Sequence, residues 1–225
     1  MHATVQYRGS QADLFRTGRA DRAITLSELP SSPALHALGP CEHLDGEITV
    51  LHGKPHVSRV REGGYQVEHG FDHGAIFLVW AQQSAWQDLP VPASVSNYLE
   101  LQTFVRDAAA GRGIDTSHAF PFLLAGTPVE LVWHINVDRT GGQPVTRELF
   151  QRSKESYVLR REAVEIVGFY SEQHGGVFIS AYAPALRADQ GEHNFMHIHF
   201  VSRDSRATGH IDDLRLDGMT LRLPA

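Results

Sequence analysis

The sequence is most informative at Phe195-Met196-His197-Ile198-His199-Phe200-Val201, where β-branched and aromatic residues predict a strand. Side chains alternate in direction along a strand, so His197 and His199 lie on one face. The apolar residues between and beside them take the opposite face, which we expect to pack in the core. A polar loop follows, and His210 begins a second run typical of a strand. A hairpin would therefore return His210 to the histidine pair.

Three imidazoles that converge from two strands would leave coordination positions open, as in a catalytic rather than a structural zinc site. The chain has 14 histidines in 225 residues, however, and one His-X-His pair is expected by chance at that frequency. The pattern alone therefore leaves two interpretations, a metal site or two half-exposed strand histidines.

The other histidines are expected outside the site. The spacings of His52 with His56 and of His69 with His73 would suit a helix, but intervening glycine and proline exclude one, so loops or strand ends are expected. Isolated histidines are expected at the surface or as satisfied core residues, with His193 a candidate to lie behind the metal ligands. The isolated set is His36, His43, His118, His134, His174 and His193.

Short strands dominate the expected secondary structure. The clearest helix is at residues 98–110, where apolar residues recur at helical spacing from Leu101, Asn97 and Glu100 resemble a capping box, and Gly111 marks the end. A second helix is expected at residues 11–16, and a turn or two of helix within the proline-broken residues 26–38. Strands are expected at residues 47–51, 56–61, 65–68, 75–80, 119–124, 129–137, 164–170, 176–182, 194–201 and 210–216.

This pattern predicts an α+β fold with mixed, mostly antiparallel β-sheets and few helices. With 42% hydrophobic and 20% charged residues, the chain can bury a core without disulfides. A Gly-Arg-Gly stretch at residues 111–113 interrupts the pattern. It suggests an N-terminal α+β half at residues 1–115 and a C-terminal β-rich half at residues 116–225.

Charge and composition argue against several classes of protein. The net charge is −6 and no basic stripe is present, which argues against nucleic-acid binding. The longest apolar run, residues 75–81, is too short to span a membrane, and residues 1–8 lack the apolar stretch of a signal peptide. Cys41 is the single cysteine, which fits a reducing compartment, so a cytoplasmic protein is expected.

Several segments, in the same order along the chain, resemble the α-acetolactate decarboxylase family. The most specific is residues 196–214, where both spacings between the family's three zinc histidines are matched. Leu44-Asp45-Gly46-Glu47-Ile48 resembles the family's L-D-G-E motif. Residues 176–180 are similar to the strand before the zinc motif.

The resemblance implies one Zn²⁺ per chain held by His197, His199 and His210, a catalytic carboxylate at Glu47, a homodimer and an acetolactate decarboxylase-like fold. The family also uses an arginine, for which Arg147 is the best match and Arg139 the alternative, although a solvated surface arginine explains Arg147 equally well. The family's further C-terminal glutamate has no counterpart, because the sequence ends at Ala225, fifteen residues after His210 (225 − 210). We therefore expect a divergent member with an altered substrate pocket.

The function implied is a zinc-dependent decarboxylase, a carbon–carbon lyase, acting on a small 2-hydroxy-3-oxo acid such as 2-acetolactate and releasing acetoin from that substrate. The metal would act as a Lewis acid for the enediolate left by loss of CO₂, and Glu47 would deliver a proton to carbon. Two alternatives remain. One is another metal enzyme, such as an oxygenase or isomerase of cupin-like chemistry. The other is a non-catalytic small-molecule-binding relative.

Overall fold

The computed structural model describes residues 4–180 and 183–225, which form two antiparallel sheets, a small two-stranded sheet and three α-helices. The helices are α1 (Gln11–Thr17), α2 (Tyr98–Ala110) and α3 (Arg147–Arg152). Every strand pair is antiparallel. The predicted fold class, mostly antiparallel sheets with few helices, is confirmed.

The first half of the chain supplies a six-stranded sheet and a separate strand pair. In spatial order the sheet contains β1 (Gln6–Arg8), β8 (Leu78–Gln82), β3 (Leu35–Pro40), β4 (Glu47–Leu51), β5 (Lys54–Arg61) and β6 (Gly64–Glu68). The pair is β2 (Ile24–Thr25) with β7 (Gly74–Ala75). Short 3-10 helices lie at Leu26–Glu28 and Glu42–Leu44, and another lies later in the chain at Ala188–Gln190.

The second sheet has eight strands. Their spatial order is β12 (Lys154–Leu159), β11 (Glu130–Asn136), β15 (Thr208–Arg215), β14 (Met196–Ser202), β13 (Val164–Tyr170), β10 (Phe120–Gly126), β16 (Thr220–Pro224) and β9 (Trp86–Pro90). The chain passes from the first sheet to the second between Gln82 and Trp86. The division at residues 115 and 116 stays a prediction.

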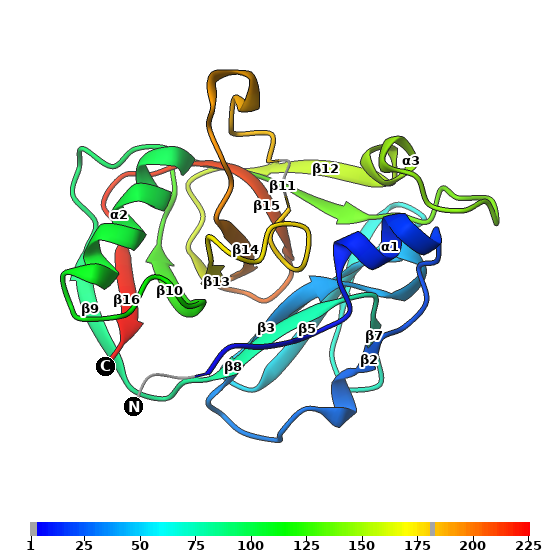
Figure 1. Cartoon of the computed structure of the whole chain (residues 1–225), viewed down its shortest axis with the longest axis horizontal. Helices are drawn as coiled ribbons and strands as arrows, with labels where there is room; N and C mark the ends of the chain where they lie inside the picture. The colour runs from blue at the N-terminus through cyan, green and yellow to red at the C-terminus, as the bar shows by residue number, and fades with distance from the viewer. Residues whose placement is uncertain (1–3, 181–182) are drawn as a thin grey trace.

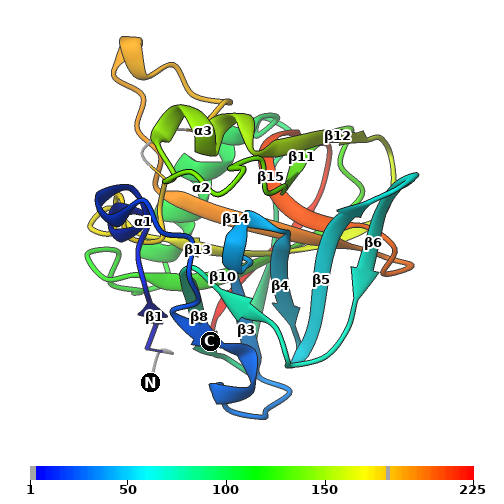
Figure 2. The same cartoon turned by 90° about the vertical axis from the view of Figure 1, so that its right-hand side faces the viewer.

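The elements stack in layers, with β4 at the centre of the contact between the sheets (Figures 1 and 2). One apolar core lies between the sheets and includes Leu38, Val79 and Val167. Another lies on the opposite face of the eight-stranded sheet, where α2 packs through residues such as Leu101 and Val105. The eight-stranded sheet is therefore covered on both faces, and its inner face can hold buried polar groups only where they have partners.

The N-terminal end of α2 follows its sequence signals, because the Asn97 side chain accepts a hydrogen bond from the Glu100 amide. No helix in the described part of the chain is long and apolar enough to cross a membrane.

Three expected elements differ from the structure. The apolar run at residues 75–80 is not one strand, because its start pairs in β7, the chain bends at Ile76 and Phe77, and β8 begins only at Leu78. Residues 176–180 form a turn rather than a strand, since the Val177 and Ile179 amides both bond the His174 carbonyl. Residues 181 and 182 lie outside the described residues. Leu26–Glu28 is the expected short helical turn, but β3 follows it unpredicted.

Candidate metal centre

The hairpin of β14 and β15 places three histidines on the inner face of the eight-stranded sheet. His199 and His210 face one another across the hairpin as paired residues, and His197 lies two residues before His199. The alternate residues Ile198 and Phe200 pack in the core beneath α2, as their apolar character requires. The hairpin expected from the sequence is thus confirmed.

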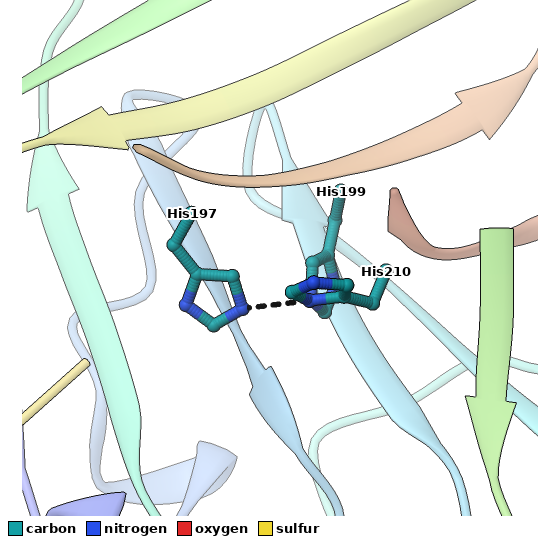
Figure 3. A group of neighbouring side chains, drawn as sticks. All are labelled: His197, His199 and His210. Carbon is teal, nitrogen blue, oxygen red and sulfur yellow. Dashed lines mark hydrogen bonds between the residues drawn. The ribbon is translucent and has the colours of Figure 1, made fainter. Parts of the chain in front are cut away.

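The three imidazole rings point toward one another (Figure 3). Nε2 of His197 lies 3.1 Å from Nδ1 of His210, and one nitrogen of each ring lies within 4.8 Å of the others. Ligand nitrogens about 2.0–2.1 Å from a tetrahedral zinc are about 3.3 Å apart. The spacing of the His197–His210 pair therefore suits coordination of one ion.

The protonation of these rings also suits a metal. His197 and His199 are 5% and 0% exposed, and burial lowers the pKa of His197 to about 3 and the pKa of His199 and His210 well below the usual range. All three rings are therefore neutral at pH 7 and carry free lone pairs. Nε2 of His199 is buried with no hydrogen-bond partner, as expected of an atom whose partner is an ion.

Two buried threonines from opposite sheets set the tautomer of His199. The Thr208 hydroxyl lies 2.6 Å from the Phe200 carbonyl, which can only accept, so Thr208 donates its proton there. Its oxygen is then the acceptor for the Thr49 hydroxyl, 2.9 Å away. Thr49 in turn accepts from Nδ1 of His199 at 3.2 Å. Nδ1 therefore carries the proton, and the lone pair of Nε2 faces the metal position.

Glu47 comes from the six-stranded sheet and closes the site from the opposite side. Its side chain is 2% exposed, its Oε2 lies 3.6 Å from Nε2 of His199, and its Oε1 accepts a hydrogen bond from the Asn136 amide. Burial raises the pKa of Glu47 well above its usual range. Glu47 is the first residue of β4, which lies between β3 and β5, and the second sheet covers its side of the strand.

A further histidine, predicted as a surface or ordinary core residue, belongs to the site. Nδ1 of His134 donates to Oδ2 of Asp212 at 2.8 Å, and its Nε2 lies 3.7 Å from Oε1 of Glu47. His134, His210 and Asp212 also form a second grouping with ligand atoms close enough for a metal. The sequence does contain a signal for His134. In His134-Ile135-Asn136 polar and apolar residues alternate within a predicted strand, which places His134 and Asn136 on the same face.

Asp212 reaches the site because the β11–β15 pairing shifts register. Val132 pairs with Asp213 but Trp133 pairs with Ile211, which leaves Asp212 as the extra residue of a bulge. Ile211 and Leu214 consequently both reach the core beneath α2. A bulge depends on the partner strand, so strict alternation in the sequence does not reveal it.

A small cavity opens beside the histidines. Its walls include Glu47, His134, Asn136, Lys154, His197 and His210. Arg147 lines a neighbouring cavity instead, where its guanidinium lies 5.5 Å above the Phe15 ring. Arg139 bonds Glu155 and the Arg152 carbonyl, with 45% of its side chain exposed. Neither arginine lines the cavity beside the histidines.

Comparisons with known proteins agree with the sequence resemblance. No family model matches the sequence, and no curated protein matches it. Among solved structures, acetolactate decarboxylases from Bacillus subtilis strain 168 and Bacillus subtilis subspecies spizizenii match with TM-scores of 0.76 and identities of 14% and 16%. They cover 99% and 98% of this chain and 86% and 85% of their own.

A Staphylococcus aureus protein of unknown function, described as similar to α-acetolactate decarboxylase, also matches with a TM-score of 0.76. It is 17% identical over 97% of this chain and 84% of its own. The resemblance first seen in the histidine and L-D-G-E motifs thus extends over nearly the whole chain, which has the acetolactate decarboxylase fold.

Proposed function

We propose that the protein is a metal-dependent carboxy-lyase that decarboxylates a small 2-hydroxy-3-oxo acid, such as 2-acetolactate or a related compound. The observation that carries the proposal is a group of three neutral histidines, of which His197 and His199 are buried and His210 is half-buried. They meet the buried carboxyl of Glu47, 3.6 Å from His199, beside a cavity. The shared fold with acetolactate decarboxylases supports it.

The residues that would hold the ion are His197, His199 and His210, and three neutral imidazoles favour zinc. A zinc ion with open positions supplies a Lewis acid for the negative charge that builds on the substrate oxygens.

The chain's own residues account for the proton. When the bond from the carboxylate to carbon 2 breaks, CO₂ leaves and the electron pair stays on carbon 2, delocalised toward the 3-oxo oxygen. Glu47, whose pKa burial raises well above its usual range, donates its proton to carbon 2 and becomes a carboxylate. Asn136 fixes the orientation of the Glu47 carboxyl by its hydrogen bond. The cytoplasmic location and the homodimer are part of the same proposal and rest on the sequence.

The test combines metal analysis with CO₂ release. Purified protein should hold one zinc ion per chain and release CO₂ from 2-hydroxy-3-oxo acids. His197→Ala, His199→Ala and His210→Ala should each lose most of the metal while staying folded. Full metal content in all three variants would contradict the site, and iron with oxygen-dependent turnover would favour an oxygenase.

The role of Glu47 is tested separately with zinc-loaded Glu47→Gln, which keeps the shape of the side chain but removes its acidity. Turnover should fall by about 10² to 10⁴-fold, the usual contribution of a positioned acid–base group. Glu62→Gln, on an exposed turn, is the matched control and should keep full turnover. Loss of zinc from Glu47→Gln would instead make Glu47 a ligand.

A further inference from the structure

Lys154, at the start of β12, is a positive charge in the wall of the metal cavity. Its side chain is 18% exposed, and no other lysine or arginine is among the described residues that line this cavity. It pairs across the strands with Asn136, the residue that holds Glu47. The ammonium group is therefore built into the site on the side of the proposed proton donor.

The hydrogen-bonding capacity of this ammonium is not used up within the protein. Lysine offers three donors. The Lys154 Nζ lies 3.9 Å from Oδ1 of Asp212, the nearest carboxylate oxygen, which is beyond hydrogen-bond distance. It lies 5.6 Å from the centre of the Phe150 ring. No described residue accepts a hydrogen bond from it. A half-buried cation whose hydrogen-bond donors lack protein acceptors favours an anionic ligand.

Lys154 also stands at the junction of two cavities. A second cavity shares Gln11, Phe150, Lys154 and Ser180 with the first. Arg147 lines only this second cavity, where it lies above Phe15. An acid whose oxygens reach the histidines would bring its carboxylate near Lys154 rather than near Arg147.

We propose that Lys154, rather than Arg147, binds the carboxylate of the substrate and so selects for 2-hydroxy acids over their neutral counterparts. The proposal rests on the proposed function, because the rest of the acid would lie toward His197, His199 and His210. Asp212 lies 3.9 Å from the ammonium group without accepting a hydrogen bond from it. Asn136, which bonds Glu47, is the cross-strand neighbour of Lys154.

Calorimetric titration of the zinc-loaded protein tests the proposal without turnover. The two ligands are 2,3-dihydroxy-2-methylbutanoate, which lacks the 3-oxo group and cannot lose CO₂ by this route, and its neutral amide. Lys154→Met should bind the acid about tenfold to hundredfold more weakly, the usual loss for a charge-assisted hydrogen bond, and bind the amide as the wild type does. Arg147→Met should keep the preference for the acid.

Each other result has a defined meaning. Unchanged acid binding in Lys154→Met, or loss of the preference in Arg147→Met alone, would overturn the proposal. Equal weakening of both ligands would also overturn it and would show that Lys154 acts through Asp212 and the metal. Lys154→Gln provides a second variant, and zinc content and unfolding midpoint verify that each variant is folded. Failure of the wild type to bind either ligand would reject the proposed function itself.

Discussion

Thr49 shows at the scale of one residue how an uncharged side chain can govern a candidate metal ligand. It is fully buried on β4 and accepts the proton of His199 only because Thr208 accepts its own. These hydrogen bonds join the two sheets and end at the Phe200 carbonyl, which can only accept. The donor and the acceptor of each hydrogen bond in the series are therefore determined. The tautomer of His199 is a consequence of this series.

Thr49→Val keeps the shape of the side chain but removes the acceptor for His199, so we expect the zinc affinity to fall by about 10- to 100-fold. Thr49→Ser retains the hydroxyl and should bind zinc nearly as the wild type does. Competition with a chromophoric chelator measures the affinity, and ¹⁵N imidazole shifts report the tautomer. Equal affinities and shifts in Thr49→Val would show that this series of hydrogen bonds has no influence.

His36 is a second residue whose burial has a measurable consequence. Neither buried ring nitrogen has a partner at normal hydrogen-bond geometry, and burial lowers the pKa of His36 from 6.5 to about 4. The nearby His52 reinforces this shift, and the Gln83 backbone and Glu165 oppose it. Between these pH values the unfolded chain binds a proton that the folded chain excludes. His36 therefore lowers the free energy of unfolding as the pH falls from 6.5 to about 4.

In His36→Phe, which cannot titrate, this part of the pH dependence should be absent. The wild type should lose up to about 3 kcal/mol more stability than the variant over that pH range. Denaturant unfolding of both proteins with a chelator present, at a series of pH values, gives the two slopes. Parallel slopes would mean that His36 takes up its proton in the folded state.

At the scale of elements, the packing of β13 against β10 depends on a missing side chain. Gly168 pairs with Phe122, and a Cβ atom added to Gly168 would lie 2.2 Å from Cζ of that ring. The ring is fully buried in the core beneath α2. The two strands can be neighbours at this register only because position 168 is glycine.

Gly168→Ala should therefore lower the free energy of unfolding by about 1–3 kcal/mol, as overpacking does, and Phe122→Leu in the same chain should recover part of the loss. Gly175→Ala is the control, because nothing lies within 4 Å of the added atom. Denaturant midpoints measure all of these variants. If the effects of Gly168→Ala and Phe122→Leu on the free energy of unfolding simply add, the strain does not lie between these two side chains.

The elements predicted from sequence differ in how local their signals are. The helix at Tyr98–Ala110 agrees with its expected bounds because its periodicity and its cap lie within the segment. Glu47–Leu51 and Val164–Tyr170 also agree, because both runs end at turn residues. The edge strands β9 and β12 have mixed polarity that resembles a loop, and only pairing with a neighbour makes them strands.

At the scale of the whole molecule, β12 and β9 are the edge strands of the eight-stranded sheet, and β1 and β6 are those of the six-stranded sheet. Val158 on β12 is 47% exposed, although it is a large apolar residue. Edges of this kind are commonly covered by a second copy. Light scattering at micromolar concentration should give twice the 25.0 kDa mass of the chain, and a mass of 25.0 kDa would contradict the homodimer.

The sequence by itself determined the histidine face of one strand, the return of His210 by a hairpin, and the L-D-G-E segment that carries Glu47. These features depend on spacings within a few residues, and the family resemblance connected them. Alternation, turn residues and motif spacing are properties of a single segment and do not depend on how the strands are later arranged. They can therefore be recognised before the fold is known.

The tertiary structure alone decided what surrounds these residues. Glu47 is buried because a second sheet covers β4. His134 lies beside it, Asp212 bonds His134, and Lys154 lies 3.9 Å from Asp212, each on a different strand far away in sequence. The bulge that directs Asp212 exists only against β11. Burial, register and the convergence of polar groups are properties of pairs of distant segments. Sheet packing sets their positions, and no periodicity within a single segment encodes them.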